Sequence, residues 1–410
     1  MTKFWASADD ASSSIEDSKS RPLPEEAARD DVFDNQPSVY GHDDDNSDAG
    51  QDEMELSKDP DWAWETIQDA QVFQDVVPVT ATKADNNCTR LVIFSDTHGL
   101  HRKVHLPRGD ILIHAGDFSK TGEVKTIEDL SEYFAESGFQ KIVVIAGNHD
   151  MTLDREYYQR RGDKIHRNPM NCDQAQAAIE RNATYLNDSS WTSDDGLTFY
   201  GSPYSPYFFG WAFNLHRGEP IKECWDKIPS HEEWPVDILM THGPPLGRGD
   251  LTAERRRAGC YDLLKAVQQR VKPRVHIFGH IHEGYGTSFD GHTLYINASS
   301  LNVQYQPVNR PIVVDIDPHD KSAPPRIVEP VNDKVNSKDE LETFCRDHGF
   351  NDVAAALASC GNAKLPLGND LLRHSSAYYK LMDALNGHRL QSVRNQLDDV
   401  LGKIYTESFE

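Results

Sequence analysis

The stretch LVIFSDTHG, residues 91–99, begins with four apolar residues and ends in polar residues and a glycine. Five later runs have a similar form, with a mostly apolar core that ends in small or polar residues: ILIHAGD at 111–117, IVVIAGN at 142–148, DILMTHG at 237–243, VHIFGH at 275–280 and TLYINAS at 293–299. Continuous apolar runs of this length are typical of strands buried on both faces. Separated by longer segments, they predict a layered α/β fold.

The segments between these runs include predicted helices, for example from Ile127 to Ser137 and from Tyr261 to Arg270. One more apolar run, from Pro311 to Ile316, is expected to close the sheet, so the folded domain is predicted to span residues 90–317. Residues 318–337 are rich in Pro and Lys and predict a linker. Residues 338–410 carry apolar side chains at helical spacing and predict a helical C-terminal extension.

The N-terminal part of the chain is strongly acidic. Residues 1–88 contain 22 acidic and 6 basic side chains, which is −16 of the net charge of −24. Residues 1–60 cannot bury enough apolar surface to offset the entropy of ordering, so we expect a disordered acidic segment. Residues 61–89 predict a linker with a possible short helix within Trp62 to Val77. That helix either docks on the body or a partner, or simply leads into the domain.

Composition excludes several classes of function. The remaining charge of −8 argues against extended nucleic-acid binding, which depends on Lys and Arg contacts to phosphates. No apolar run is long enough to cross a bilayer, and the first ten residues lack the apolar core of a secretory signal. The six cysteines form no C-x-x-C pair and are interpreted as reduced thiols. We therefore expect an intracellular, cytoplasmic protein without membrane contact.

Short polar motifs follow five of the predicted strands: Asp96-Thr97-His98, Gly116-Asp117, Gly147-Asn148-His149-Asp150, His242-Gly243 and Gly279-His280-Ile281-His282. In open α/β sheets, ligands bind beyond the carboxyl ends of the strands, so these motifs can converge. A single motif of this kind is often a surface turn. Five of them at successive strand ends predict one shared site.

The side chains of these motifs suit a pair of metal ions. Seven are candidate ligands: Asp96, His98, Asp117, Asn148, His242, His280 and His282. Carboxylate, imidazole and amide oxygen suit Mn²⁺, Fe and Zn²⁺. Asp117 is the candidate bridge, because a carboxylate has two oxygens. Asp96, His98 and His282 would complete one metal site and the other three residues the second. A hydroxide that bridges the ions is the expected nucleophile, with phosphorus in line.

Two further residues are candidates for contacts with substrate, and a third is a candidate to orient one of them. His149 follows Asn148, and adjacent residues rarely point at one ion. We therefore expect His149 to contact a phosphoryl oxygen and to protonate the leaving alkoxide as a general acid. Asp150 is a candidate to orient His149. Arg248, in GPPLGRGD, is a candidate contact for the phosphate or the leaving group.

Other histidines and aromatic residues have two interpretations. His114 and His276 lie inside apolar runs and are predicted to be core histidines with satisfied hydrogen bonds. His101 and His105 either touch substrate or lie on a solvated loop. An aromatic cluster follows GSPYSP and either stacks a nucleobase at the mouth of the site or packs beneath a long loop: Tyr204, Tyr207, Phe208, Phe209 and Trp211.

In this order, the motifs resemble those of the calcineurin-like metallophosphoesterase superfamily over residues 90–317. The exact motif sequences are similar to those of the metallophosphoesterase-domain-containing proteins of the brain-enriched type. These motifs are FSDTHG, LIHAGDF, VIAGNHD, GSPYSP, THGPPLG, GHIHEGYG and INASS. The resemblance implies a four-layered αββα sandwich, two mixed β-sheets flanked by helices, with a dinuclear site at the sheet edge. It also implies hydrolysis of phosphodiesters such as cyclic nucleotides, with Mn²⁺ favoured. The family's ligands fall on the same seven residues, with His149 facing the substrate.

Three functions remain open at this point. The first is a phosphodiesterase whose substrate is a small phosphate ester, a nucleotide above all. The second is a phosphomonoesterase or a protein phosphatase, although the Gly-Asp motif continues as FSKTGE and lacks the D-R-G of protein Ser/Thr phosphatases. The third is a non-catalytic scaffold that uses its fold and tails for partners. The intact set of seven ligands favours an enzyme, because a scaffold does not need them.

Overall fold

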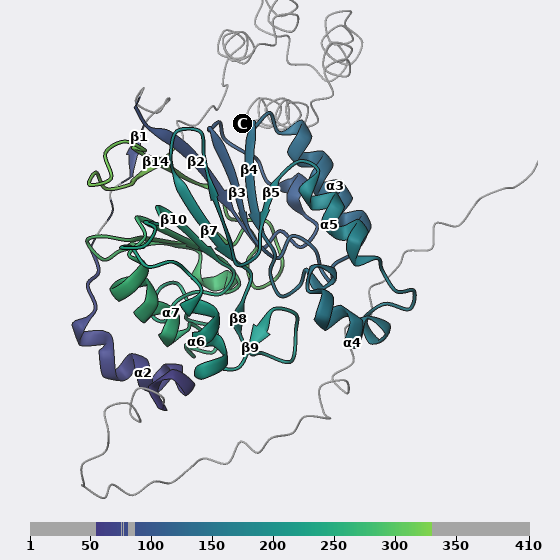
Figure 1. Ribbon diagram of the computed structural model, residues 1–410, viewed down its shortest axis with the longest axis horizontal. Coiled ribbons are helices and arrows are strands. Elements are labelled where there is room, and N and C mark those ends of the chain that lie inside the picture. The colour runs from purple at the N-terminus through teal and green to yellow at the C-terminus, as the bar shows by residue number, and fades with distance from the viewer. Residues whose placement is uncertain (1–54, 75, 77, 81–86, 330–410) are drawn as a thin grey trace, which may run out of the picture. The chain divides into compact units, whose positions relative to one another are not determined.

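The computed structural model describes residues 55–74, 76, 78–80 and 87–329 (Figure 1). The predictions for the acidic segment up to residue 54 and for the helical extension 338–410 lie outside these residues. Among the described residues, no helix is both long and apolar enough to cross a membrane.

Two mixed β-sheets form the centre of the fold. The first has seven strands in the order β1-β15-β14-β2-β3-β4-β5, and the second has six in the order β12-β13-β11-β10-β7-β6. The strands of the first sheet are β1 (Val79–Thr80), β2 (Thr89–Phe94), β3 (Ile111–Ala115), β4 (Lys141–Ile145), β5 (Thr184–Leu186), β14 (Ile312–Ile316) and β15 (Arg326–Glu329). Those of the second are β6 (Ser189–Thr192), β7 (Thr198–Ser202), β10 (Ile238–Thr241), β11 (Val275–Phe278), β12 (Gly286–Phe289) and β13 (Leu294–Asn297). A separate pair is formed by β8 (Ser205–Pro206) and β9 (Asn214–Leu215).

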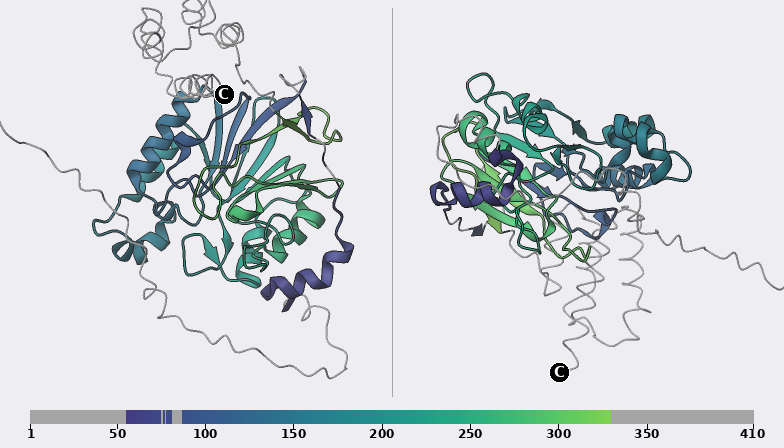
Figure 2. Two further views of the ribbon diagram at one scale, coloured as in Figure 1. Left: turned by 180° about the vertical axis from the view of Figure 1, so that it is seen from behind. Right: turned by 90° about the horizontal axis from the view of Figure 1, so that it is seen from below.

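Helices cover the outer faces of both sheets (Figures 1 and 2). The helices on the first sheet are α3 (Val124–Glu136), α4 (Arg155–Ile165) and α5 (Cys172–Glu180). Those on the second are α6 (Glu219–Asp226) and α7 (Tyr261–Lys265), which continues as the π-helix η5 (Ala266–Val271). Short 3₁₀ turns are η2 (Gln68–Ala70), η3 (His101–Lys103), η4 (Met151–Leu153) and η6 (His282–Gly284). The predicted four-layered αββα sandwich is therefore confirmed.

Strand β2 explains why the apolar runs are continuous. Leu91 and Ile93 pack into the core between the two sheets, whereas Val92 and Phe94 pack into the core beneath α3 and α5. Successive side chains of a strand point to opposite faces, so a strand buried on both faces needs apolar residues at every position. All seven apolar runs noted in the sequence form strands.

The domain extends beyond the boundaries predicted from sequence. The sheet does not close near residue 317, because β14 lies inside it, antiparallel to both β2 and β15. Strand β15 comes from the predicted linker 318–337, and β1, from the predicted linker 61–89, pairs with it in parallel. Pro and charged residues flank β15, and this masked its short apolar core, Ile327 and Val328.

Residues 55–74, here called the N-terminal strap, pack on the second sheet's helical layer (Figure 1). The helix α2 (Pro60–Ile67) begins there, and its N-cap Asp59 accepts hydrogen bonds from the amides of Asp61 and Trp62. Ala63 is fully buried against residues of α7 and the preceding loop. The predicted short helix is thus present, starts earlier than expected, ends at Ile67, and docks on the body.

Candidate metal centre

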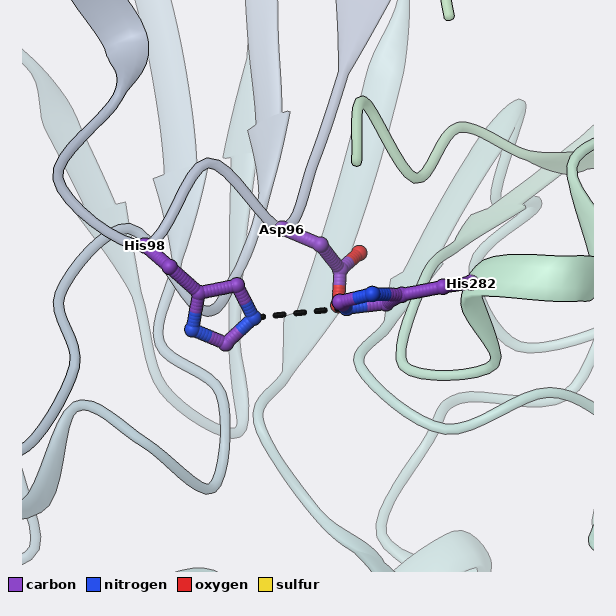
Figure 3. A group of neighbouring side chains, drawn as sticks. All are labelled: Asp96, His98 and His282. Atoms are coloured by element: carbon purple, nitrogen blue, oxygen red, sulfur yellow. Dashed lines mark hydrogen bonds and ion pairs between the residues drawn. The ribbon is translucent and has the colours of Figure 1, made fainter. Parts of the chain in front are cut away.

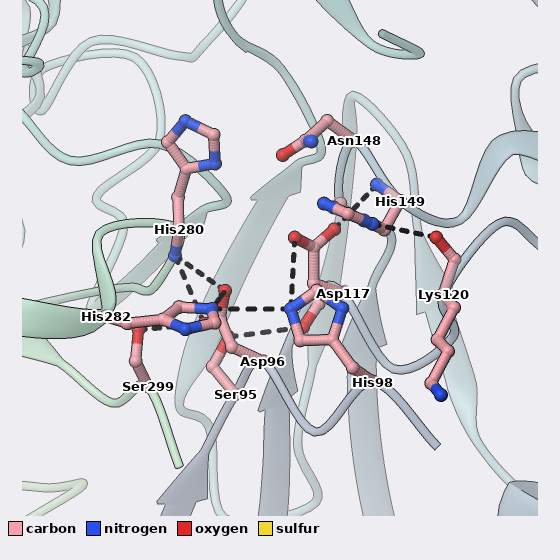
Figure 4. A network of polar contacts seen from close by, with 12 residues as sticks. Ser95, Asp96, His98, Asp117, Lys120, Asn148, His149, His280, His282 and Ser299 are labelled. Atoms are coloured by element: carbon pink, nitrogen blue, oxygen red, sulfur yellow. Dashed lines mark hydrogen bonds and ion pairs between the residues drawn. The ribbon is translucent and has the colours of Figure 1, made fainter. Parts of the chain in front are cut away.

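The five polar motifs lie at the carboxyl ends of strands from both sheets. In the first sheet β2, β3 and β4 are parallel neighbours, and in the second sheet β10 and β11 are. Each motif begins one or two residues after its strand ends, so the motifs from both sheets meet at one place (Figure 4). This is the location expected for a ligand site in a parallel sheet.

The backbone at this place is strained. Four of the candidate ligands adopt left-handed conformations, with φ of 51° at Asp96, 42° at His98, 55° at Asp117 and 68° at His280. Residues with a Cβ rarely adopt this conformation, which costs on the order of 1–3 kcal/mol per residue and is concentrated at functional sites. The strain therefore indicates a functional site without reference to side-chain chemistry.

The first group of candidate ligands is Asp96, His98 and His282, whose ligand atoms lie within 4.8 Å of one another (Figure 3). The two Nε2 atoms of the histidines are 3.3 Å apart. Nε2 of His282 is 3.5 Å from Oδ1 of Asp96. Two imidazole nitrogens and a carboxylate oxygen that face a common point can hold one divalent cation.

The carboxylate of Asp96 is also fixed by its neighbours. It accepts hydrogen bonds from the amide of His280 over 2.9 and 3.1 Å and from Oγ of Ser299 over 3.0 Å (Figure 4). Gly279 permits this close approach, because a Cβ at that position would lie 1.9 Å from Oδ2 of Asp96. The glycine of G-H-I-H is therefore required by the packing around the carboxylate.

The second group is Asp117, His242 and His280. Nε2 of His242 is 3.2 Å from Oδ2 of Asp117 and 2.9 Å from Oδ1 of Asn148. The same Oδ2 of Asp117 is 3.9 Å from Nε2 of His98, which belongs to the first group. Asp117 therefore lies between the two groups, as a bridging ligand must.

Both carboxylates are buried without a permanent cation beside them. In the described part of the chain, the salt-bridge partners of Asp96 and Asp117 are all histidines. Burial alone raises the pKa of Asp96, but hydrogen bonding and the charges of His282 and His242 outweigh it and lower the pKa. Burial opposes protonation of His242, yet the charge of Asp117 raises its pKa to about 9. A divalent cation would supply the charge that these buried carboxylates need.

His98 and His280 differ from His242 in charge. Burial lowers the pKa of each to about 3, so both imidazoles are neutral near pH 7. A neutral imidazole has the lone pair that a metal ion requires. With the carboxylates and the amide oxygen of Asn148, these two neutral imidazoles offer ligands for a divalent ion in each group, whereas His242 and His282 would have to release a proton to bind one.

His149 borders the centre and is held from two sides. Its Nδ1 donates a hydrogen bond to the carbonyl of Lys120 over 2.7 Å, and its backbone amide donates to Oδ1 of Asp117 over 2.8 Å (Figure 4). The ring is half-buried and lies 4.6 Å from that of His98, edge to face. Because Nδ1 is bonded to the carbonyl of Lys120, Nε2 is the nitrogen left for another ligand.

Asp150 does not orient His149, contrary to the prediction. Its Oδ2 accepts from the amides of Asp117 and Gly147, and its Oδ1 accepts from the amide and hydroxyl of Ser119. Burial and the nearby charge of Asp117 raise the pKa of Asp150 to about 7. Asp150 therefore fixes the loop that carries Asp117, and the carbonyl of Lys120 orients His149 instead.

Arg248 does not reach the centre. Its side chain is fully buried, with the guanidinium carbon 4.1 Å from the ring centroid of Phe73 and 4.7 Å from that of Tyr295. Nη2 donates to the carbonyl of Val72 over 3.0 Å. The predicted contact with phosphate is contradicted, because a guanidinium enclosed by the N-terminal strap and Tyr295 is not accessible to a substrate.

His114 and His276 are buried core histidines, as predicted, and they occupy equivalent positions in the two sheets. His114 bonds through Nε2 to Oγ1 of Thr97 over 3.0 Å, and His276 to Oγ1 of Thr241 over 2.9 Å. Each threonine adjoins a candidate ligand, so these histidines also support the centre from behind. Nδ1 of His276 is buried without a hydrogen-bond partner, so that ring is satisfied on one side only.

Neither interpretation of His101 holds. His101 is fully buried and bonds through Nε2 to Asp129 over 2.8 Å, so it faces α3 rather than substrate or solvent. His105 is exposed, which agrees with a solvated loop position.

Tyr305 and Asn297 lie at the site, although the sequence analysis did not predict a role for them. Tyr305, half exposed and with φ of 56°, has its ring centroid 5.0 Å from that of His98 and 5.2 Å from that of His282. It lies in an irregular loop with no recognisable pattern. Asn297 donates to the carbonyl of Ile281 over 2.8 Å and so holds the G-H-I-H turn. The position of Asn297, a polar amide at the end of an apolar run, was the feature of the sequence that could have indicated this role.

The aromatic cluster after GSPYSP reaches the centre through one ring. The indole of Trp211 packs on the imidazole of His149, with centroids 4.1 Å apart and planes inclined by 37°. Tyr204 packs inside on Phe213, whereas Phe208 and Phe209 are exposed. The cluster is therefore divided between core packing and the mouth of the site.

Comparisons with known proteins agree with the fold and the centre. The sequence profile of the calcineurin-like phosphoesterase family matches residues 89–284, a region that contains all five motifs. The chain belongs to this family and is a metal-dependent phosphoesterase, which makes it a hydrolase. Metallophosphoesterase domain-containing protein 1 of Homo sapiens is 45% identical over 253 residues, which are 59% of this chain and 75% of the relative. The protein of the same name from Mus musculus matches equally. A UPF0046 protein of Caenorhabditis elegans is 34% identical over 65% of this chain and 69% of its own length.

Proposed function

We propose that this protein hydrolyses phosphodiesters, with cyclic nucleotides as the favoured substrates and Mn²⁺ as the favoured metal. The observation that carries the proposal is the position of Asp117. Its carboxylate lies between two groups of candidate ligands, and His149 donates its backbone amide to the same carboxylate. Two metal sites and a substrate-facing histidine are thereby linked through one residue.

Seven residues would hold the two ions. Asp96, His98 and His282 belong to one site, and the other consists of Asn148, His242 and His280, with Asp117 shared. Two divalent ions would supply the positive charge that makes a water nucleophilic and that stabilises charge on the phosphoryl oxygens.

His149 is the proposed general acid. In its neutral form, Nδ1 carries the proton that it donates to the carbonyl of Lys120, so Nε2 holds a lone pair. To protonate a leaving alkoxide, His149 must first take up a second proton at Nε2. The fixed hydrogen bond at Nδ1 keeps the ring oriented before and after the transfer.

The charges around the centre favour a diester over a monoester. A diester carries one negative charge, whereas a monoester carries up to two near neutral pH. Arg248, the candidate for a bidentate contact with a phosphate, is turned into the protein. The proposed substrate is therefore a small monoanionic phosphodiester.

The test is hydrolysis of bis(p-nitrophenyl) phosphate by metal-stripped protein, with and without added Mn²⁺. Asp117→Asn and His149→Ala are measured beside it, with Asp163→Asn and His105→Ala as controls at exposed positions. We expect activity that requires metal, collapses in Asp117→Asn and persists in both controls. His149→Ala should lose more activity toward a cyclic nucleotide, whose leaving alkoxide needs a proton, than toward this ester, whose p-nitrophenolate does not.

Other outcomes identify other functions. Activity on p-nitrophenyl phosphate or a phosphopeptide, without activity on the diester, would replace the proposal with a monoesterase or a protein phosphatase. No turnover of any of these at saturating Mn²⁺, together with binding of proteins to the tails, would establish a scaffold.

We also propose an intracellular, cytoplasmic location. The four described cysteines, Cys88, Cys172, Cys224 and Cys260, are free thiols, which suits a reducing compartment. Fractionation of cells that express the tagged chain tests this, and recovery in the secreted or membrane fraction would refute it.

A further inference from the structure

We propose that Trp211 selects substrates whose leaving group carries an aromatic ring, such as a nucleobase, by packing against that ring. This inference rests on the proposed phosphodiesterase function. It concerns residues 207–213, here called the aromatic loop, whose sequence YFFGWAF contains no charged side chain.

The aromatic loop is held firmly at its base. Strands β8 and β9 pair in parallel on either side of it, and the amide of Tyr207 donates to the carbonyl of Leu215 over 2.8 Å. The ring of Tyr207 stacks on that of His216, with centroids 4.4 Å apart and planes inclined by 17°. The amide of Phe213 donates to the carboxylate of Asp154 over 2.9 Å. A loop fixed in this way can present its rings at low cost in conformational entropy.

Trp211 lies where a leaving group must pass. Its indole is 4.1 Å from the imidazole of His149, centroid to centroid. The same imidazole donates a hydrogen bond from Nδ1 to the carbonyl of Lys120 and meets the ring of His98 edge to face. Because the proposed proton donor is Nε2 of the same ring, the leaving oxygen must come within hydrogen-bond reach of His149. The substituent on that oxygen then lies beside Trp211 or the tip of the aromatic loop.

The tip of the aromatic loop is apolar and exposed. Phe208 is 59% exposed and Phe209 is 67% exposed, and their rings contact only edge to face at 4.4 Å. Large apolar side chains gathered beside a catalytic centre commonly mark a ligand-binding surface. Stacking on an aromatic side chain tolerates different bases, because every base has a π-face. The aromatic loop thus suits an aromatic substituent but is not expected to discriminate between different bases.

Two cyclic phosphates with the same five-membered diester test this inference. 2′,3′-Cyclic AMP carries a base, whereas glycerol 1,2-cyclic phosphate does not. Steady-state KM and kcat are measured for both with the metal-loaded full chain and with Trp211→Leu, Trp211→Phe and the control Trp62→Leu, at an exposed tryptophan of α2. We expect Trp211→Leu to raise KM for cyclic AMP by about tenfold and to change KM for the glycerol ester by less than about twofold. Trp211→Phe should retain most of the preference in KM for cyclic AMP, and Trp62→Leu should change KM for neither substrate.

Equal losses for both substrates, in kcat alone, would overturn the inference and leave Trp211 as a support for His149. Calorimetry of the metal-loaded protein with the products 3′-AMP and glycerol phosphate separates this failure from failure of the proposed function. If neither cyclic ester is hydrolysed, the phosphodiesterase proposal fails, but tighter binding of 3′-AMP that is lost in Trp211→Leu still supports aromatic recognition. Equal affinities for the two products in the unmodified protein would refute it.

Discussion

The backbone amide of Asp117 donates a hydrogen bond to Oδ2 of Asp150 over 2.9 Å. A carboxylate outside the proposed ligand set thereby fixes the loop of the residue that links the two metal sites. Among the described residues, the Asp150 carboxylate accepts four hydrogen bonds, three from backbone amides and one from the hydroxyl of Ser119.

Asp150→Asn should therefore weaken metal binding without removing a ligand. One oxygen of the carboxylate becomes an NH₂ group, which cannot accept from the two donors that face it. We expect a loss of roughly 10–100-fold in metal affinity or activity, the size typical of residues that orient ligands. Metal content after dialysis against a graded chelator measures it, with Asp163→Asn as the control. Metal retention equal to that of the control would contradict this role.

Addition of Mn²⁺ to metal-stripped protein should raise the melting temperature, because the ions bind the folded state and neutralise Asp96 and Asp117. At 100 times Kd the gain is about 2.7 kcal/mol for one site. Asp96→Asn should lose much of this gain, since it removes one buried charge and one ligand. Calorimetric melts at increasing Mn²⁺ provide the measurement. A shift in Asp96→Asn as large as in the unmodified protein would show that the ions bind elsewhere.

Stability should fall as pH falls below 6.5, partly through His276. Burial lowers its pKa to about 3, whereas in the unfolded chain the value is near 6.5. The unfolded state therefore takes up the proton first, so the contribution is complete above pH 6.5 and is lost progressively down to about pH 3. Each such histidine adds a slope of about 1.4 kcal/mol per pH unit within this window.

His276→Gln should flatten that slope by about one histidine's share. The glutamine amide can still donate to Oγ1 of Thr241, but it has no group that titrates in the window. Urea unfolding at half-unit steps between pH 4 and 6.5 gives the slope, with exposed His105→Gln as the control. A slope unchanged by His276→Gln would mean that His276 is already protonated in the folded state.

A buried ion pair joins the strand before the centre to its antiparallel neighbour. Arg90 and Asp315 lie directly opposite each other on β2 and β14, with two hydrogen bonds of 2.8 and 3.0 Å. Asp315→Ala should cost about 3–5 kcal/mol of unfolding free energy, because it leaves a buried guanidinium without its partner. The double variant Arg90→Met with Asp315→Leu should recover most of this loss. Guanidinium chloride unfolding tests both, and a double variant as unstable as the single one would refute the explanation.

The metal-facing residues could be found from sequence for a physical reason. Asp96 and Asp117 follow apolar runs that form neighbouring parallel strands of the first sheet, and His242 follows one that forms a strand of the second sheet. Parallel pairing brings the carboxyl ends of the strands together within each sheet. A residue that directly follows a predicted strand can therefore be placed near the site from sequence, and its side-chain chemistry then indicates its role.

The predictions for Arg248 and Asp150 were wrong because the direction of these side chains depends on tertiary packing and not on their position after a strand. Arg248 and Asp150 lie next to motif residues in sequence, yet Arg248 turns under the N-terminal strap and Asp150 turns beneath the loop of Asp117. Trp211 could be noted as aromatic, but its contact with His149 joins loops from two parts of the chain. No local pattern specifies such contacts.

The close contact between the Trp64 ring and Gly247 bears on where this domain can be truncated. The ring lies so close that a Cβ on Gly247 would come within 1.8 Å of it, and the guanidinium carbon of Arg257 lies 4.5 Å from the centroid of the same ring. The region shared with the family, residues 89–284, contains neither Trp64 nor β13, β14 and β15. A gene fragment, splice form or protease product cut to those limits would lose β1, β14 and β15 from the first sheet and β12 and β13 from the second, and it would uncover the apolar surface around Leu246. The core of the described residues therefore includes the N-terminal strap and strands β12 to β15, all of which lie outside the region that the family profile matches.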